Sequence, residues 1–274
     1  MHILQTVAEL RAARKPGQKI VLVPTMGNLH AGHLSLVRMA REHGDLVLTS
    51  IFVNRLQFAP HEDFAKYPRT FERDCELLAG GGCDIVFAPS DADVYPEPQG
   101  YTVHAPAELA GILEGAVRPA FFTGVCTVVL KLFNMVQPAA AVFGKKDYQQ
   151  LLVIRSMVRQ LALPIEVVSA ETVRDSSGLA LSSRNGYFSD SQRTQAAQLH
   201  AALTQLAAAV KSGRADWPAL ERAAQDLLEL GGWQPDYVAI RRRSDLGEAS
   251  RNEPLVALAA ARLGGTRLID NLEI

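Results

Sequence analysis

Two histidines stand three residues apart where an apolar run gives way to a predicted helix. Residues 20–33 read IVLVPTMGNLHAGH, which predicts a buried strand, a glycine-containing turn and the start of a helix. Residues three apart share one face of a helix, so His30 and His33 can both donate hydrogen bonds to phosphate oxygens. A helix start at the carboxyl end of a strand also offers unpaired N–H groups to an anion. The segment therefore predicts a phosphate-binding site.

The same spacing has two other interpretations. An isolated HxxH most often consists of surface residues, and it can also belong to a metal site like that of the zinc peptidases. The metal interpretation lacks the glutamate of HExxH and a nearby third ligand. The strand, turn and helix around the two histidines favour phosphate binding over surface placement.

A second strand, glycine turn and helix are predicted at residues 141–150, which read AVFGKKDYQQ. Lys146 offers a compact cation for triphosphate oxygens, and Asp147 could bond ribose hydroxyls or support the lysine. A charged turn of this kind, taken alone, is usually a solvated surface. Its position after a predicted strand favours nucleotide binding for this segment.

Two loops complete the set of candidate binding segments. Residues 173–185 carry two hydroxyls and a guanidinium, which suit a mobile loop that closes over phosphates. Asn54 and Gln57 follow a predicted strand, and their amides can both donate to and accept from small polar substrates. The alternative for an isolated Asn or Gln in a loop is capping of the backbone.

Residues 23–38, VPTMGNLHAGHLSLVR, resemble the pantothenate synthetase (pantoate–β-alanine ligase) family. Within them HAGH is similar to the HIGH signature of class I aminoacyl-tRNA synthetases and nucleotidyltransferases. The resemblance implies a Mg²⁺- and ATP-dependent condensation of (R)-pantoate with β-alanine through a pantoyl-adenylate, which releases AMP and diphosphate. It also implies a cytoplasmic homodimer.

The resemblance implies three groups of ATP-binding residues and a small set of substrate contacts. The ATP-binding residues are Met26, Gly27, Asn28, Leu29, His30, Ala31, Gly32 and His33; Gly144, Lys145, Lys146 and Asp147; and Val173, Leu181, Ser182, Ser183 and Arg184. Val173 is expected to reach the adenine through its backbone, and residues 181–184 are similar to the KMSKS loop. Gln57 is expected to contact pantoate and β-alanine with Asn54 beside it, and Gln150 to contact pantoate.

The implied catalytic residues are His33, His30, Lys146 and Arg184, which would stabilise charge on the α-phosphate and the leaving diphosphate. The family gives His33 the role of proton donor, which we interpret as a charge-stabilising hydrogen bond. No residue is assigned directly to a metal. Asp74 could support Mg²⁺ through water, because Mg²⁺ keeps much of its hydration, and the alternative is a solvated aspartate on a helix surface.

Four positions depart from the family's pattern. Arg55 and Leu56 stand where relatives commonly have proline followed by a small or apolar residue. Lys145 stands where relatives often carry Glu or Gln, and Phe121 where they typically have His. Arg118, near Phe121, remains available as a phosphate or carboxylate partner, although a loop arginine before proline is as often only solvated.

The candidate residues must be positioned by helices and strands, and the pattern of these elements in the sequence predicts an α/β fold with two domains. A Rossmann-like parallel sheet with helices on both faces is expected in residues 1–173, and a smaller α+β domain in residues 174–274. The expected strands are 20–24, 45–53, 84–88 and 140–143, followed by 237–241 and 255–263 in the second domain. The expected helices are 31–43, 70–79, 123–136, 148–163, 189–211 and 216–230.

Composition excludes several classes of protein. The chain has 274 residues with a formal net charge of −1, so the clustered cationic surface of a nucleic-acid-binding protein is not expected. Its three cysteines show no CxxC pairing, which argues against a disulfide framework or a structural zinc site. No apolar run approaches the roughly 20 residues of a membrane helix, and no signal peptide is expected.

Two rival functions remain open. One is a related HIGH-motif adenylyltransferase that acts on another small carboxylate, or a small aminoacyl-tRNA synthetase paralogue. The other is a regulatory protein that binds a nucleotide and has lost catalysis, although His30, His33 and Lys146 are all present.

Overall fold

The computed structural model describes residues 1–59 and 64–274, and the chain forms two compact units. Unit 1 comprises Met1–Pro106, Arg118–Lys145 and Val153–Glu171. Unit 2 comprises Ala107–Val117, Lys146–Leu152 and Thr172–Ile274. The sequence suggested one boundary after residue 173, whereas two earlier segments also belong to unit 2.

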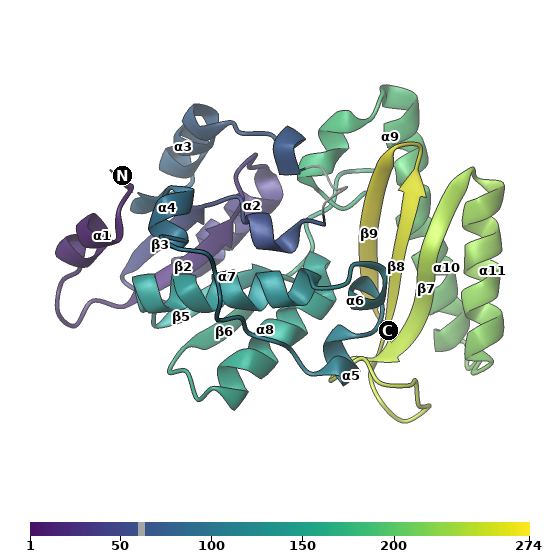
Figure 1. The fold of residues 1–274 in the computed structure, drawn as a ribbon. Coiled ribbons are helices and arrows are strands. Elements are labelled where there is room, and N and C mark those ends of the chain that lie inside the picture. The colour runs from purple at the N-terminus through teal and green to yellow at the C-terminus, as the bar shows by residue number, and fades with distance from the viewer. Residues whose placement is uncertain (60–63) are drawn as a thin grey trace. The chain divides into compact units, whose positions relative to one another are not determined.

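Unit 1 is built on a parallel sheet with the strand order β1-β4-β3-β2-β5-β6 (Figure 1). The strands are β1 (His2–Leu4), β2 (Ile20–Thr25), β3 (Leu46–Ile51), β4 (Ile85–Phe87), β5 (Ala140–Gly144) and β6 (Glu166–Ala170). The chain moves from β2 outward through β3 to β4 and then returns to the other side of β2 as β5. This reversal places a topological switch point between β2 and β5, where ligands bind in open α/β sheets.

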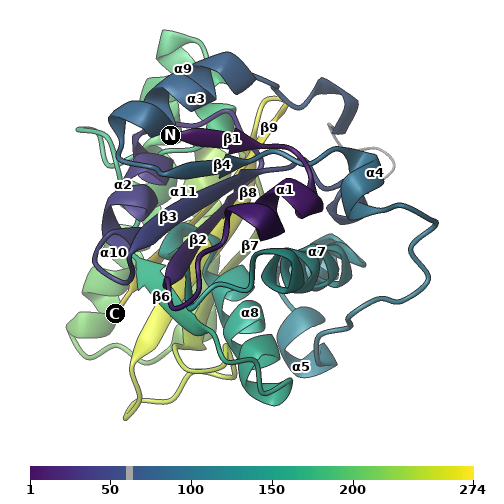
Figure 2. The same cartoon turned by 90° about the vertical axis from the view of Figure 1, so that its left-hand side faces the viewer.

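Helices cover both faces of this sheet, and α2 and α7 lie on opposite sides of the strands (Figure 2). The α-helices with residues in unit 1 are α1 (Val7–Ala13), α2 (Ala31–Ala40), α3 (Phe71–Gly80), α4 (Asp91–Val94), α7 (Phe121–Val136) and the second half of α8 (Tyr148–Gln160). Val37 of α2 and Leu78 of α3 pack with Val21, Val47 and Val86 of the sheet. The predicted α/β fold class is therefore confirmed.

Helix α7 packs closely against a short 3₁₀ turn, η1 (Arg55–Gln57), that follows β3. At Gly124 a Cβ atom would lie 2.2 Å from the carbonyl oxygen of Leu56, so the contact is possible only without a side chain. The Gly124 carbonyl also accepts a hydrogen bond from the Asn54 side chain at 3.1 Å. Gly124 thus sets the distance between α7 and the loop that carries Gln57.

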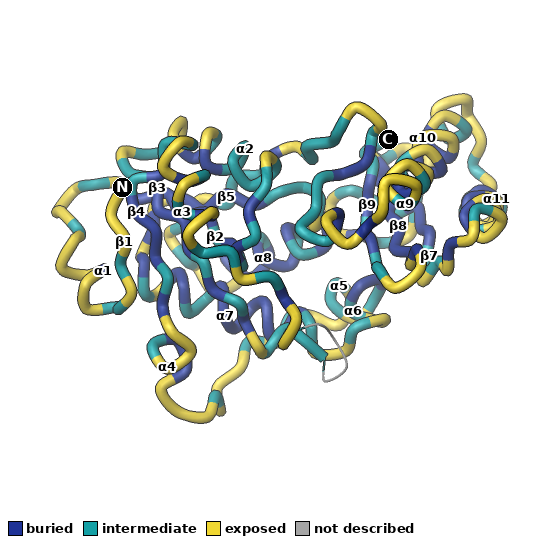
Figure 3. The backbone as a smooth tube through the Cα atoms, turned by 90° about the horizontal axis from the view of Figure 1, so that it is seen from above, coloured by how far each residue is buried: buried dark blue, intermediate teal, exposed yellow. Residues whose placement is uncertain are grey.

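Unit 2 contains an antiparallel sheet of three strands with helices packed on it, as an α+β domain requires. The strands are β7 (Trp233–Arg242), β8 (Leu255–Leu263) and β9 (Thr266–Glu273). The helices are α5 (Ala107–Ala110), α6 (Glu114–Val117), α9 (Asp190–Ala196), α10 (Gln198–Lys211) and α11 (Trp217–Leu230). Leu203 and Leu228 of the helices share a core with Ile240 and Ala257 of the sheet. Figure 3 shows buried residues along the strands and exposed residues on the outer turns of the helices.

Most predicted elements are confirmed, and several differ from the prediction. Strands β1, β6 and β9 were not expected: β1 has three residues, and β6 and β9 mix polar with apolar residues. The helix expected at 189–211 is two helices, since α9 ends at Ala196 and α10 begins at Gln198, and neither proline nor glycine accounts for the break. Among the described residues no helix is long and apolar enough to cross a membrane.

The close approach at Gly124 gives a test of this packing. Gly124→Ala is expected to lower the free energy of unfolding by about 1–3 kcal/mol, because the added methyl group forces α7 and η1 apart. Gly80→Ala is the matched control: it lies at the end of α3 with nothing within 4 Å of its Cβ position, so its stability should not fall. Chemical denaturation of both variants measures the difference, and equal stabilities would contradict the assignment.

Candidate active site

A buried carboxylate binds backbone N–H groups of the turn after β2. Asp74, on α3, has none of its surface exposed. Its Oδ2 accepts the N–H of Asn28 at 2.8 Å and the Thr70 hydroxyl at 3.1 Å, while Oδ1 accepts the N–H of Leu29 at 2.8 Å. Gly27 has φ +80°, and a Cβ atom there would lie 3.1 Å from Asp74 Oδ2. The glycine lets the turn close onto the carboxylate.

This geometry corrects part of the sequence interpretation. We expected unpaired N–H groups at the helix start, but those of His30 and Gly32 are bound by the two histidine rings. In the preceding turn, the N–H groups of Asn28 and Leu29 bind Asp74. The solvated surface position considered for Asp74 is wrong, because the side chain is buried. Its two oxygens accept three protein donors, and water-mediated support of Mg²⁺ by Asp74 stays a prediction.

The two histidines cap the helix that they begin. His30 is the N-cap of α2, and its Nδ1 accepts the N–H of Gly32 at 3.1 Å. His33 Nδ1 accepts the N–H of His30 at 3.4 Å, which completes a reciprocal capping box. The two rings lie 4.1 Å apart between centroids. A neutral imidazole that accepts through Nδ1 carries its proton on Nε2, so each histidine presents an Nε2–H donor.

Gln57 is fixed by its neighbours at the end of β3. Its Nε2 donates to Sδ of Met26 at 3.1 Å, and its Oε1 accepts from the Asn54 side chain at 3.1 Å. Asn54 Oδ1 accepts from the Tyr95 hydroxyl at 2.6 Å and the Leu56 N–H at 3.3 Å, so the buried Asn54 amide is saturated. This favours the capping alternative for Asn54, whose side chain orients the amide of Gln57. Tyr95 was missed because no local pattern links it to Asn54.

A cavity of about 550 Å³ opens beside this turn at the carboxyl ends of β2, β3 and β4. Its wall includes Gly27 and Asp74 as well as Thr70. On the other side of β2, Val21 and Leu22 pair with Ala140 and Ala141 of β5, so Gly144 ends the neighbouring strand. Residues 26–33 and 144–145 therefore meet at the switch point, as the sequence predicts for a phosphate site.

Each departure from the family's pattern has a partner within unit 1. The guanidinium of Arg118 lies 3.8 Å from the ring centroid of Phe121 and donates to the Gln57 carbonyl at 3.2 Å. Lys145 forms an ion pair with Glu171, which accommodates a cation where relatives carry Glu or Gln. Arg55 pairs with Asp91 at 3.0 Å. Leu56 contributes the carbonyl that packs on Gly124.

Unit 2 contains Lys146, Asp147 and two neighbouring glutamines with different environments. Gln149 is buried, accepts the N–H of Glu114 at 3.0 Å and donates to the carbonyls of Leu109 and Ile112. Gln150 is half-buried. The saturated contacts of Gln149 make it a structural residue and leave Gln150 as the candidate for the substrate, as the sequence suggested.

The third candidate segment, also in unit 2, begins as a tight hairpin. The N–H of Leu181 donates to the carbonyl of Val173 at 2.9 Å, so this carbonyl is engaged in the hairpin. Ser182 is the N-cap of the 3₁₀ turn η4 (Ser183–Tyr187), and its hydroxyl accepts the Arg184 N–H at 3.3 Å. Both Ser183 and Arg184 lie within this turn.

Comparison with known proteins agrees with the geometry. The profile of the family described as pantoate-beta-alanine ligase matches residues 2–273. The chain belongs to the pantoate–β-alanine ligase family. A curated pantothenate synthetase from Leptothrix cholodnii is 59% identical over the full length of both proteins. The resemblance that the sequence indicated is therefore confirmed, and with it the ATP-dependent ligation of pantoate and β-alanine.

Solved structures of the family have the same fold. The crystal structure of pantothenate synthetase from Thermus thermophilus has a TM-score of 0.95 and 46% identity, and covers 100% of this chain and 99% of that one. The pantoate-beta-alanine ligase from Francisella tularensis, complexed with beta-gamma ATP and beta-alanine, has a TM-score of 0.83 and 32% identity, with 100% and 97% covered.

The role of Asp74 can be tested by neutralising it. In Asp74→Asn one acceptor oxygen becomes an amide that faces N–H donors, so the free energy of unfolding should fall by about 1–3 kcal/mol. Thr70→Val, which removes one hydroxyl donor and keeps the shape of the side chain, should cost about 1 kcal/mol or less. Denaturant titrations provide both values, and an Asp74→Asn protein as stable as Thr70→Val would refute the assignment.

Proposed function

We propose that the chain activates the pantoate carboxylate as a pantoyl-adenylate and then transfers the pantoyl group to β-alanine. A carboxylate oxygen of pantoate attacks the α-phosphorus of ATP, and the bond from that phosphorus to the bridging oxygen of diphosphate breaks. The neutral amine of β-alanine then attacks the carbonyl carbon, and AMP leaves with the oxygen that came from pantoate. The observation that carries the proposal is that both histidines accept backbone N–H groups through Nδ1 at the start of α2, which in a neutral ring leaves the proton on Nε2.

In the first step the protein has to stabilise negative charge that builds on the α-phosphate and on diphosphate. His30 and His33 donate through Nε2 without any rearrangement of the turn, because their Nδ1 atoms are already bound to backbone N–H groups. Donors that are oriented before the reaction lose little energy in reorganisation. We assign the cations Lys146 and Arg184, from unit 2, to the same developing charge.

In the second step the pantoyl group must be held while β-alanine attacks. Gln57 and Gln150 are our candidates, with Gln57 oriented by Met26 and Asn54. Alignment of the two reacting groups accounts for much of the acceleration in such reactions, since a bimolecular step becomes effectively unimolecular. The remaining ATP contacts are proposed on the motif alone: residues 26–33, 144–147, 173 and 181–184.

Mg²⁺ is proposed as the partner of the ATP phosphates. Mg²⁺ keeps several waters and is bound in such sites mainly by substrate phosphates, whose charge it neutralises. In residues 1–59 and 64–274 no group of three or more His, Cys, Asp or Glu side chains is arranged to hold a metal ion. We also propose that the protein is a cytoplasmic homodimer. Sedimentation of the purified protein would test whether it is a dimer.

Isotope transfer separates this mechanism from its rivals. Pantoate labelled with ¹⁸O in the carboxylate should pass one ¹⁸O to AMP, and pantoate should support exchange of diphosphate into ATP without β-alanine. Label in inorganic phosphate would indicate an acyl phosphate instead of an adenylate. If other small acids but not pantoate support the exchange of diphosphate into ATP, the protein is the alternative adenylyltransferase. If no acid supports this exchange, the protein is the alternative regulatory protein.

The dual role of His30 predicts that two amide variants have opposite defects. His30→Asn keeps an acceptor for the Gly32 N–H and loses the distal donor, so stability should change by less than about 0.5 kcal/mol and adenylation should fall about 100- to 1000-fold. His30→Gln places an amide N–H nearer the Nε2 position and weakens the cap, so it should be less stable and more active than His30→Asn.

Single-turnover formation of the adenylate and thermal denaturation measure the two properties. His33→Ala, which lacks both groups, should lower adenylate formation by orders of magnitude while the protein still folds. Equal activities of His30→Asn and His30→Gln would contradict the proposed use of Nε2.

A further inference from the structure

A buried ion pair in unit 2 has no part in the mechanism above. Asp270, on β9, has a side chain that is 3% exposed, and its two oxygens accept from Nη1 and Nη2 of Arg174 at 2.7 Å and 2.9 Å. Both hydrogen bonds are charge-assisted and run in parallel, which is the most directional geometry available to an arginine. Such a pair fixes the relative positions of the two segments that carry it.

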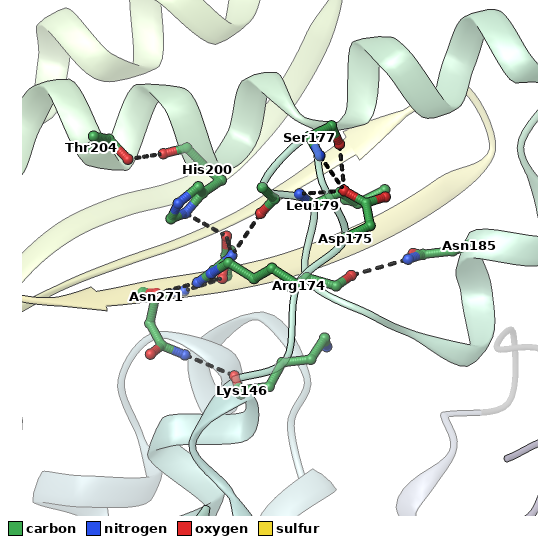
Figure 4. A network of polar contacts seen from close by, with 12 residues as sticks. Lys146, Arg174, Asp175, Ser177, Leu179, Asn185, His200, Thr204 and Asn271 are labelled. Carbon is green, nitrogen blue, oxygen red and sulfur yellow. Dashed lines mark hydrogen bonds and ion pairs between the residues drawn. The ribbon is translucent and has the colours of Figure 1, made fainter. Parts of the chain in front are cut away.

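His200, on α10, joins the ion pair as a third member (Figure 4). Its Nδ1 lies 3.4 Å from Asp270 Oδ2. Burial works to raise the pKa of Asp270, but the contacts with His200 and Arg174 and the N–H of Asn271 outweigh it, so this pKa lies below its usual range. At Gly178, with φ +89°, a Cβ atom would lie 2.8 Å from the His200 ring. The hairpin therefore rests directly on the histidine.

Arg174 also shapes the hairpin that precedes Ser182 and Arg184. Its Nη1 donates to the Gly178 carbonyl at 3.1 Å, across the turn. Inside the turn Asp175 accepts the N–H groups of Ser177 and Leu179. The side chain of Asn185 donates to the Ala180 carbonyl at 3.0 Å and ties η4 to the hairpin. The ion pair and the candidate phosphate loop thus form one connected structure.

Asn271 extends this structure to the second candidate segment. Its backbone carbonyl accepts from Nη2 of Arg174 at 3.1 Å, and its N–H donates to Asp270 Oδ1 at 2.8 Å. Its side-chain Nδ2 donates to the backbone carbonyl of Lys146 at 2.8 Å. Figure 4 shows Asn271 between the ion pair and Lys146. One residue of the last strand therefore connects Lys146 with Arg174.

We infer that Asn271, together with the Asp270–Arg174 pair, positions Lys146 and residues 181–184 for the triphosphate of ATP. The inference rests on the proposed ATP contacts and adds three positioning residues, of which Asp270 and Asn271 lie outside every candidate segment. Neither Asn271 nor Asp270 needs to touch the nucleotide. Their effect is to keep two separate segments in the arrangement that binding requires, and displacements of about 1 Å can lower rates by about 100-fold.

The test uses Asn271→Ala in the full-length protein, which removes the link to Lys146 and keeps the backbone bonds to Asp270 and Arg174. The dissociation constant of a non-hydrolysable ATP analogue with Mg²⁺, from titration calorimetry, should rise about tenfold. The KM for β-alanine should not change. Gln198→Ala is the matched control, because it removes another part-buried amide contact of unit 2, with Trp233, that touches neither segment.

A double-mutant cycle with Lys146→Ala distinguishes positioning from general destabilisation. If Asn271 acts through Lys146, Asn271→Ala should have little further effect on analogue binding once the Lys146 amine is gone. Arg174→Lys, which keeps the charge and loses the bidentate geometry, should still weaken binding in that background through residues 181–184.

Additive effects of Asn271→Ala and Lys146→Ala in folded proteins would overturn the inference, as would unchanged analogue affinity in Asn271→Ala. Loss of affinity equal to that of Gln198→Ala would also overturn it. The measurement is independent of the acid substrate, so a failure of pantoate to support catalysis would contradict the proposed function and leave this test intact.

Discussion

The arrangement of unit 1 depends on the bonds between the buried Asp74 carboxylate and two backbone N–H groups of the turn after β2. A polar turn at the end of a buried strand would leave unpaired N–H groups against the protein interior, and each such group costs about 1–3 kcal/mol. The carboxylate removes that cost and fixes where α2 begins. Because α2 begins there, the two histidines can cap it with Nδ1 and present Nε2 as a donor. The geometry of the candidate catalytic pair thus follows from a buried carboxylate on another helix.

Contacts between neighbouring side chains also hold the positions at which this chain departs from the family's pattern. Phe121 stands where the resemblance leads us to expect a histidine, and the guanidinium of Arg118 lies over its ring and donates to the carbonyl of Gln57. Lys145 stands where the resemblance leads us to expect an acid or an amide, and it pairs with Glu171. In each case the new side chain finds a partner of matching chemistry beside it. The four departures therefore take part in the contacts that hold the loops, and Gln57, Lys146 and Asp147 are present in the sequence.

The sequence predicted the parts of the molecule that depend on local pattern. Strands β2, β3 and β5 are apolar runs, and residues 30–33 follow one of them, so the candidate phosphate site at the end of that strand could be anticipated. What could not be anticipated are contacts between residues far apart in the chain. Asp74 is 45 residues from Leu29, and Asp270 is 96 residues from Arg174. Nothing near Asp74 in the sequence indicates that it is buried, and nothing near Asn271 points to Lys146.

The capping box made by His30 and His33 has an implication for how the protein can change. Each imidazole can meet two requirements at once, since one nitrogen completes the helix start and the other can carry the proton. Asparagine and glutamine each supply one of these groups in the right place, and no other side chain supplies both. A mutational path away from histidine at either position must therefore pass through a variant that loses either the fold of the turn or the donor. A residue that must meet two requirements resists substitution even in a protein that would tolerate some loss of stability.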